Sequence, residues 1–596
     1  MNLKFNYINK IHQIKFNFFF LTLLGIIIFI SGYHFSKFGL DLTDTGFFLY
    51  LQNNISQGKI NDVGLLSLTC GSDIIGAIWL NIFQKNPELI SARLGAFLIV
   101  YLICIFLFFI LIEISKNKWL SAFLVVFIYL LWPGIKSFPI INYDLVPLLP
   151  LSIFFYLFIL TKNNNKNFNL LNILIGFTSC ILIFTRLPLF LPVIIILGIN
   201  IYFEKLEKFK IFKKYFTGFV FALFFLILIP ICRNYFIHSY INIMKISNGD
   251  TSLYYKLNSD SNYGITTQLY FWIRGYFRIF IIIILILFLA FLNKKLVKYL
   301  NDNFLKGFTI FIFLSITLFL NKISDVLGFD YLQFYNNFFN YFLESIFIVI
   351  CIIILINKKN EYREITLFAL IFFVFYPVGS NSFEKKLILS APIFFIPIYL
   401  IYLKNTTYDS VYLKIENQLD LKNIIRVIGI TYIVISVVNL YNFIPYRESA
   451  IHKLNKKIQT KGLKNIQTTE ERYEAVMPLY NWLNNTTNSK NTLLCLDRTS
   501  LLNYTLKLDG VFDYPWPLLL DNNFFSNRLN NLDKKNKAPD YIVIPLIDMS
   551  IPNWEKQKPP FKLDDFHNKY LSIYLLKYSI VYKSEYFTVW KNIKTK

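Results

Sequence analysis

Residues 92–113 read ARLGAFLIVYLICIFLFFILIE, and their only charges, Arg93 and Glu113, lie at the two ends. A run of about 20 apolar residues is long enough to cross the hydrocarbon core of a bilayer as an α-helix. Over the whole chain, 55% of the 596 residues are hydrophobic and the mean hydropathy is +0.48. Comparable runs stand at residues 16–33, 119–135, 145–161, 170–185, 187–203, 215–232, 276–293, 305–320, 338–356, 365–377, 387–403 and 424–443. We therefore predict a polytopic α-helical membrane protein with about 13 transmembrane helices.

The basic residues are distributed as membrane topology would require. The formal net charge is +24, which in a soluble protein would suggest a nucleic-acid partner. Here Lys4, Lys10 and Lys15 precede the first run, and most other lysines gather in alternate loops. Cytoplasmic loops are enriched in Lys and Arg. The pattern therefore predicts a multi-pass protein of the cell (inner) membrane with a cytoplasmic N-terminus, and it argues against nucleic acid.

The remaining loops carry acidic residues, and the first of them is long. Within the predicted outer loop 34–91, residues 46–56 and 73–83 have apolar side chains at helical spacing. Both stretches are too short to span a bilayer, so we predict helices lying in the membrane interface. An odd number of crossings places the C-terminus outside. The sequence thus predicts a transmembrane domain at 1–443 and an extracytoplasmic soluble domain at 444–596.

The predicted soluble domain has the pattern of an α/β fold. Residues 492–497, 541–545 and 579–590 are rich in β-branched and aromatic residues, which predicts strands. Residues 468–482 predict a helix with Thr468 or Thr469 as its N-cap.

The first outer loop opens with an acidic motif, Phe38-Gly-Leu-Asp41-Leu-Thr-Asp44-Thr-Gly46. A carboxylate near membrane depth is costly unless it faces a cavity or a partner. The two aspartates are therefore either a functional pair or ordinary residues of a solvated loop.

Other motifs follow this one in a fixed order. They are Asn142-Tyr-Asp144 in the second outer loop, Phe184-Thr-Arg186-Leu-Pro188 at the end of the fifth run, Pro377-Val-Gly-Ser-Asn381 in a late outer loop, and Pro445-Tyr-Arg447 at the start of the soluble domain. Together they resemble the GT-C superfamily of integral membrane glycosyltransferases, in particular bacterial relatives of protein O-mannosyltransferases and of the aminoarabinose transferase. The family often has Asp-Glu in the first loop, whereas here Thr45 follows Asp44, which leaves open whether Asp41 supplies the second carboxylate.

The resemblance implies a GT-C-like fold and transfer of a sugar from a polyprenyl-phosphate donor at the outer face of the membrane. The acceptor would be a glycan, a lipid or a protein. Such a transfer needs a base for the acceptor hydroxyl, and it passes through an oxocarbenium-like transition state. We assign the base to Asp44, with Asp41 as its partner or as the base itself. Asp144 is a candidate for acceptor binding, or alternatively the N-cap of the fourth span.

Cations are expected to hold the departing phosphate. Arg186 ends a span on the outer side, where it would bind phosphate or only extend toward the membrane surface. Lys385, Lys386 and Arg274 are further candidates for substrate binding. Arg447 is expected to pin the soluble domain to the membrane domain. Carboxylates with an open position could hold Mg²⁺ or Mn²⁺, but the sequence neither requires a metal nor names its ligands.

Two other functions fit a polytopic chain. A polymerase or ligase of envelope polysaccharides would rely on Arg and His in large outer loops. A transporter or flippase for lipid-linked sugars would place charged residues within spans, and these runs hold few.

The soluble domain shows no nucleophile–base pair and no Gly-rich phosphate loop. Its residues 512–517, Phe-Asp-Tyr-Pro-Trp-Pro, either face a sugar or form part of the domain core. We expect this domain to shape acceptor choice and to supply no catalytic group.

Overall fold

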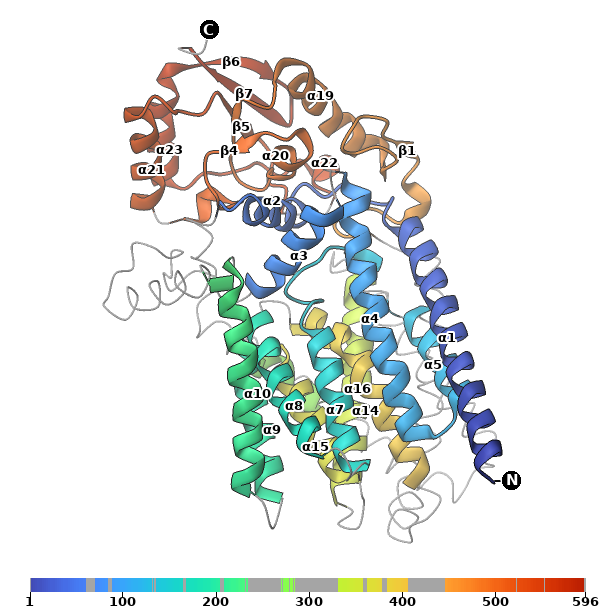
Figure 1. Cartoon of the computed structure of the whole chain (residues 1–596). Coiled ribbons are helices and arrows are strands. Elements are labelled where there is room, and N and C mark those ends of the chain that lie inside the picture. The colour runs from blue at the N-terminus through green and yellow to red at the C-terminus, as the bar shows by residue number, and fades with distance from the viewer. Residues whose placement is uncertain are drawn as a thin grey trace.

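The computed structural model shows a bundle of helices with a sheet-containing unit across one end (Figure 1). The N-terminus lies at the far end of the bundle and the C-terminus lies in the sheet-containing unit. The structure describes residues 2–59, 70–83, 88–130, 132, 136–163, 168–203, 208–230, 232–233, 270, 272–277, 279–281, 283–284, 331–356, 362–377, 383–405, 445–520, 522–550 and 553–593.

The bundle is built from the predicted apolar runs. Its helices are α1 (Asn2–Phe35), α4 (Leu89–Ser115), α5 (Lys118–Leu130), α7 (Leu148–Asn163), α8 (Phe168–Thr185), α9 (Phe190–Phe203), α10 (Lys208–Leu228), α14 (Tyr331–Ile356), α15 (Arg363–Phe375) and α16 (Phe383–Asn405). Among the described residues, α1 from Lys15 onward, α4, α8 and α10 are long and apolar enough to cross a membrane. Runs 305–320 and 424–443, and most of 276–293, lie outside the described residues. The count of about 13 therefore stays a prediction.

Helix α4 lies at the centre of the bundle, packed against α1, α5, α7 and α16. Its side chains are buried along most of its length, whereas those of α10 are largely exposed on one side. Large apolar side chains such as Phe216, Phe221 and Phe224 on that exposed side are what a helix facing lipid tails would carry.

Two glycines allow helices α8 and α10 to approach closely. A Cβ added at Gly218 of α10 would lie 1.9 Å from the backbone oxygen of Ile173, and one at Gly176 of α8 would lie 2.0 Å from that of Tyr215. Small residues at facing positions allow helix backbones to approach in membranes. The α8–α10 pair therefore depends on having hydrogen atoms at these two positions.

We predict that Gly218→Ala destabilises the protein by about 1–3 kcal/mol, because the new methyl group forces the two helices apart. Thermal unfolding in detergent, followed by fluorescence, measures the effect. Gly198→Ala is the matched control, since Gly198 lies in α9 and a Cβ there meets nothing within 4 Å. Equal melting temperatures for the two variants would contradict this account of the contact.

Beyond the bundle, residues from 445 onward form a five-stranded sheet in the order β4-β3-β5-β7-β6. Its strands are β3 (Thr492–Cys495), β4 (Asp509–Gly510), β5 (Tyr541–Pro545), β6 (Tyr578–Lys583) and β7 (Phe587–Asn592). Strand β3 pairs in parallel with β4 and β5, and β7 pairs antiparallel with β5 and β6. Around them lie α19 (Glu470–Thr486), α20 (Leu501–Leu506), α21 (Asn522–Lys534), α22 (Trp554–Gln557) and α23 (Asp565–Tyr574), while β1 (Lys456–Lys457) and β2 (Gln467–Thr468) form a separate small sheet.

Most of the predicted elements in this part are present. Helix α19 begins after Thr469, whose side chain accepts a hydrogen bond from the Arg472 N–H at 3.2 Å, so the predicted cap is confirmed. We predicted a single strand for the stretch 579–590, and this prediction is wrong. The stretch forms the hairpin β6–β7, because the polar residues from Ser584 to Tyr586 make a turn in which the Ser584 hydroxyl accepts from the Tyr586 N–H.

The two short helices of the first outer loop are α2 (Asp44–Ser56) and α3 (Cys70–Phe83). Helix α2 lies beneath the sheet-containing unit, and most of its residues are buried. The predicted position of these two helices in the membrane interface stays a prediction. A Cβ at Gly46 would lie 2.5 Å from the Leu501 nitrogen of α20. The Tyr50 hydroxyl donates to the Phe512 backbone oxygen, and Asn54 donates to that of Asp513 at 3.1 Å.

Two of the three rings in the aromatic run 512–517 are buried, and the third, Trp516, is partly exposed. Phe512 and Tyr514 are each 2% exposed, and Tyr514 lies edge-on to Phe47 of α2 with ring centroids 5.7 Å apart. For Phe512 and Tyr514, the assignment to the core is confirmed.

Candidate functional site

Two buried arginines hold residues 36–44, the segment that carries the acidic motif. Arg93 of α4 donates at 2.8–2.9 Å to three backbone oxygens of this segment, those of Ser36, Phe38 and Gly39. Arg472 of α19 donates to the Leu40 oxygen at 3.3 Å. Buried carbonyl groups need hydrogen-bond donors, so this segment can follow its path only where both arginines are present.

Arg472 is also the centre of a buried charge cluster. It lies 2.8 Å from Glu555 and 3.4 Å from Glu448. Glu448 in turn accepts hydrogen bonds from the Leu40 N–H at 2.9 Å and from the Thr468 hydroxyl at 2.5 Å. Burial raises the pKa of Glu448, and the positive charge of Arg472 opposes that shift. The Arg472 guanidinium thus joins residues 36–44 to the C-terminal part of the chain.

Asp41 caps helix α2. Its Oδ1 accepts from the Thr43 N–H at 3.1 Å and from the Thr43 hydroxyl at 2.6 Å, and its Oδ2 accepts from the Thr45 N–H at 2.8 Å. The side chain is 3% exposed. Carboxylates that accept from the first N–H groups of a helix stabilise its start. Asp41 therefore orients the turn that presents Asp44, which fits its predicted role as a partner. Its alternative role as the base stays a prediction.

Asp44 begins α2 and is partly accessible, with its side chain 20% exposed. Its Oδ2 accepts a hydrogen bond from the Tyr446 hydroxyl and lies 3.3 Å from the Arg447 guanidinium. Oδ1 accepts no hydrogen bond from the described residues. The fold thus brings together a carboxylate, a phenol and a guanidinium across about 400 positions of sequence.

Arg447 joins the two halves of the chain, as its predicted pinning role requires. It donates to the Thr43 hydroxyl at 3.0 Å and to the Met549 backbone oxygen at 3.5 Å. Burial lowers the pKa of Arg447, but the charges of Asp44 and Asp41 and the contact with Tyr446 together offset this, and the pKa is raised. Burial, with the charge of Asp44, raises the pKa of Tyr446 far above its ordinary value, so Tyr446 remains a hydrogen-bond donor. Tyr446 had no predicted role, although it stands beside Arg447 in the motif.

Asp144 and Arg186, which lie 42 positions apart, meet in the structure. The Arg186 Nη1 lies 3.9 Å from the Asp144 Oδ1, and the guanidinium stacks on the Tyr376 ring at 4.8 Å. The Tyr376 hydroxyl donates to the Asp144 backbone oxygen at 2.6 Å. Arg186 is 1% exposed. Its alternative role, extending toward the membrane surface, is therefore wrong, because the side chain turns inward toward a carboxylate.

Asp144 is not the N-cap of α7, because this helix begins at Leu148 and Asp144 lies in the turn before it. The Asn142 side-chain oxygen accepts from the N–H groups of Asp144 and Leu145 at 2.8 and 3.0 Å. The Asp144 side chain, which is 18% exposed, is thereby left for the contact with Arg186.

One further acid, Asp73 of α3, is buried and received no role from the sequence. It is 2% exposed, and its Oδ1 has no hydrogen-bond partner among the described residues. Its neighbour Gln52 of α2 also donates to the Ile141 backbone oxygen at 2.7 Å. Helix α3 is too short to span the membrane. Burial raises the pKa of Asp73 to about 7, and the hydrogen bond with Gln52 opposes the shift. Its sequence environment, Cys70-Gly-Ser-Asp73, gave no sign of this burial.

The other predicted substrate-binding cations are not brought to Asp44 by any described contact. Arg274 is exposed on a helical turn, and among the described residues no ion pair joins it to a carboxylate. Lys385 and Lys386 lie in the first turn of α16, but their side chains lie outside the described part of the structure. Their roles remain predictions.

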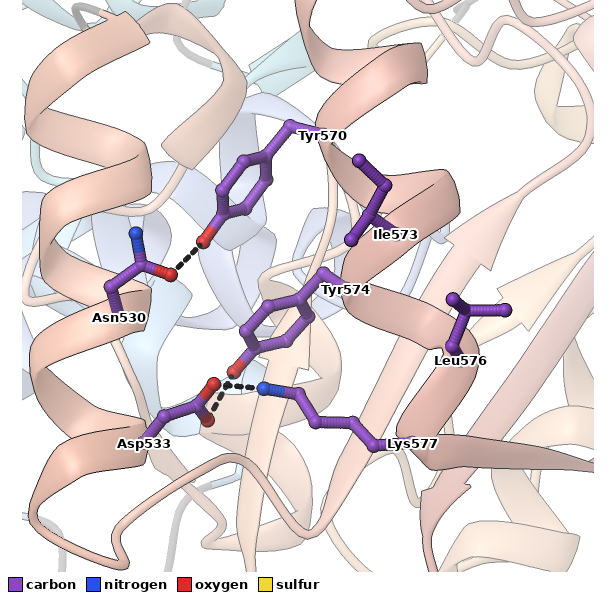
Figure 2. A pocket seen from close by; sticks show the side chains of 7 residues that line it. All are labelled: Asn530, Asp533, Tyr570, Ile573, Tyr574, Leu576 and Lys577. Carbon is purple, nitrogen blue, oxygen red and sulfur yellow. Dashed lines mark hydrogen bonds and ion pairs between the residues drawn. The ribbon is translucent and has the colours of Figure 1, made fainter.

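A surface hollow of about 350 Å³ lies elsewhere, between α21 and α23 (Figure 2). The polar side chains that line it are already paired with one another. Tyr570 donates to Asn530 at 2.8 Å, Tyr574 donates to Asp533 at 3.0 Å, and Lys577 forms an ion pair with Asp533. We place the candidate site at Asp44 instead, where charged groups from distant segments converge.

No group of three or more His, Cys, Asp or Glu side chains converges within the described ranges as metal ligands would. Whether Mg²⁺ or Mn²⁺ takes part is therefore not decided by these residues.

No protein-family model and no curated protein matches the sequence. Two solved structures are similar over 96% of this chain and 98% of their own. One is ArnT from Cupriavidus metallidurans bound to undecaprenyl phosphate, with a TM-score of 0.47 and 10% identity. The other is the same protein in the apo state, with a TM-score of 0.40 and 11% identity. ArnT is a GT-C glycosyltransferase, the superfamily that the motifs resemble. Similarity at this level assigns no donor, acceptor or site to this chain.

Asp73 gives a pH-dependent stability that can be measured. Its pKa is about 7 in the folded protein and near 3.8 when unfolded, so the folded state binds more protons between these values. Stability therefore falls as the pH rises from about 4 to 7, by about 4 kcal/mol at most. We predict that Asp73→Asn flattens this fall.

Melting temperatures in detergent at pH 5, 6, 7 and 8 test the prediction. Asp509→Asn serves as the control, because the Asp509 side chain is 58% exposed. Parallel melting profiles for the wild type and Asp73→Asn would show that Asp73 is not the titrating group.

Proposed function

We propose that this chain is a membrane glycosyltransferase that moves a sugar from a polyprenyl-phosphate donor to an acceptor hydroxyl. The observation that carries the proposal is Asp44, an accessible carboxylate held between the apolar bundle and the sheet-containing unit by Tyr446 and Arg447. A lipid-linked sugar would have its tail among apolar helices and its reacting carbon at their polar end. That is where Asp44 lies.

Asp44 is the proposed base. A base must be fixed in position and still be reachable by the hydroxyl it deprotonates. Contacts with Tyr446 and Arg447 fix Oδ2, and Asp41 fixes the turn beneath. Oδ1 is then the oxygen that can receive the acceptor proton as the new glycosidic bond forms.

Arg447 is the cation proposed to act beside it. It is 17% exposed, and its charge is maintained by the neighbouring carboxylate. A guanidinium can bind two phosphate oxygens at once. Arg186 is far less accessible, and its contact with Asp144 suits it to orient that carboxylate. Lys385 and Lys386 remain proposed partners for the phosphate.

The orientation that we propose has the N-terminus in the cytoplasm and both the first loop and residues 444–596 outside. This is supported by the lysines that precede the first span and by the acidic residues in the predicted outer loops. The identity of the sugar, hexose or pentose, and of the acceptor follows from the assay below.

We predict that Asp44→Asn lowers transfer at least ~100-fold, because the amide cannot take a proton. The assay supplies radiolabelled hexose and pentose donors linked to polyprenyl phosphate, and it measures label lost from the donor to cell-envelope acceptors. The exposed variant Asp509→Asn should retain wild-type activity. Activity near wild type in Asp44→Asn would remove this residue as the base.

The same assay separates this function from that of a polysaccharide polymerase. Arg274→Ala should have little effect, since Arg274 is exposed and makes no ion pair with the described residues. A larger loss from Arg274→Ala than from Asp44→Asn would favour the polymerase. Transport of the donor across proteoliposomes without transfer would favour a flippase.

A further inference from the structure

One edge of the five-stranded sheet lies toward Asp44. Strands β3 and β5 are parallel neighbours, so their carboxyl ends lie at the same edge of the sheet. Asp497 follows the end of β3 and Asp548 follows the end of β5. Loops at the carboxyl ends of parallel strands are where α/β proteins gather ligand-binding groups.

This edge lies directly against Arg447. The Arg447 guanidinium reaches the backbone oxygen of Met549, next to Asp548, at 3.5 Å. Asp497 interacts electrostatically with both Arg447 and Asp548. Arg447 therefore contacts Asp44 and interacts electrostatically with Asp497.

A second series of side-chain contacts links this edge of the sheet to helix α2. The Arg498 guanidinium stacks on Trp516 at 5.2 Å, and the Trp516 ring lies 4.7 Å from that of Phe47. Phe47 is one turn along α2 from Asp44. The side chains of Asp497 and Arg498 are 18% and 24% exposed, so they are accessible in the same degree as Asp44.

The backbone at Asp497 is in the left-handed region, with φ of +53°. Aspartate adopts this region more readily than most residues with a side chain. Burial raises the pKa of Asp497 to about 6, with Arg498 opposing the shift, so the group is largely ionised at neutral pH.

We propose that Asp497, Arg498 and Trp516 bind a carbohydrate acceptor and hold its hydroxyl toward Asp44. A carboxylate accepts hydrogen bonds from sugar hydroxyls, a guanidinium donates to them, and an indole contacts the apolar face of a sugar ring. The sheet-containing unit thereby supplies the acceptor side of the site. This assignment rests on the proposed function in its placement of Asp44, but the binding of sugar can be tested without it.

The test measures binding by the full chain in detergent. The probes are the methyl glycosides of glucose, galactose, mannose and N-acetylglucosamine, followed by saturation-transfer NMR and by tryptophan fluorescence. At least one probe should bind the wild type saturably. Asp497→Asn and Arg498→Gln should each weaken it about 10-fold, a loss typical of one charged hydrogen bond, while the melting temperature stays unchanged.

The hollow of Figure 2 provides the matched control, since its tyrosines and carboxylate are also of a kind that binds sugars. Tyr570→Phe should leave binding intact. Failure of every methyl glycoside to bind, or loss of binding in Tyr570→Phe but not in Asp497→Asn, would overturn the assignment. Binding that depends on Asp497 in a protein that transfers no sugar would overturn the proposed function and leave this assignment standing.

If the purified protein transfers sugar, the acceptor KM and the rate of donor hydrolysis provide a second test. Asp497→Asn should raise the acceptor KM while hydrolysis of the donor by water is unchanged, whereas Asp44→Asn should abolish both reactions. An unchanged acceptor KM in Asp497→Asn would also contradict the assignment.

Discussion

Two buried guanidinium groups determine the path of the chain between α1 and α2. Arg93 and Arg472 donate to the backbone oxygens of residues 36–40, which would otherwise be buried without partners. Leaving a buried polar group unpaired costs several times what a hydrogen bond contributes. Removing one partner from a buried ion pair typically costs about 3–5 kcal/mol. The position of Asp44 therefore depends on charges in α4 and α19, far from it in sequence.

The local features of this fold can be predicted from the sequence. Apolar runs of sufficient length gave helices, and Thr469 caps α19 because a hydroxyl before Glu470 satisfies a free N–H group. Local rules fail where tertiary contacts take over. The apolar spacing of 46–56 was correct for a helix, but it did not show that α2 packs against α20. Periodicity shows which face is apolar and does not name what covers it.

The candidate site was predictable in part, and for a physical reason. The acidic motif pointed to Asp44, because a carboxylate near membrane depth is costly, and the motifs that carry the family resemblance pointed to Asp144 and Arg447. The pairing of Asp44 with Tyr446, and of Asp144 with Arg186, arises from contacts between distant segments, which no local pattern encodes. Asp497 resembled an ordinary loop residue for the same reason. Its neighbours Arg447 and Asp548 come from two other segments.

Thr43 and Arg447 are in contact but lie 404 positions apart in the sequence. This separation has a consequence for biosynthesis. At about 5–20 residues per second, a ribosome takes roughly 20–80 s to cover that distance. Throughout this interval the nascent chain contains Asp44 but lacks the arginine and the tyrosine that fix its carboxylate. A chain that stalls before residue 446 therefore leaves this carboxylate without either partner.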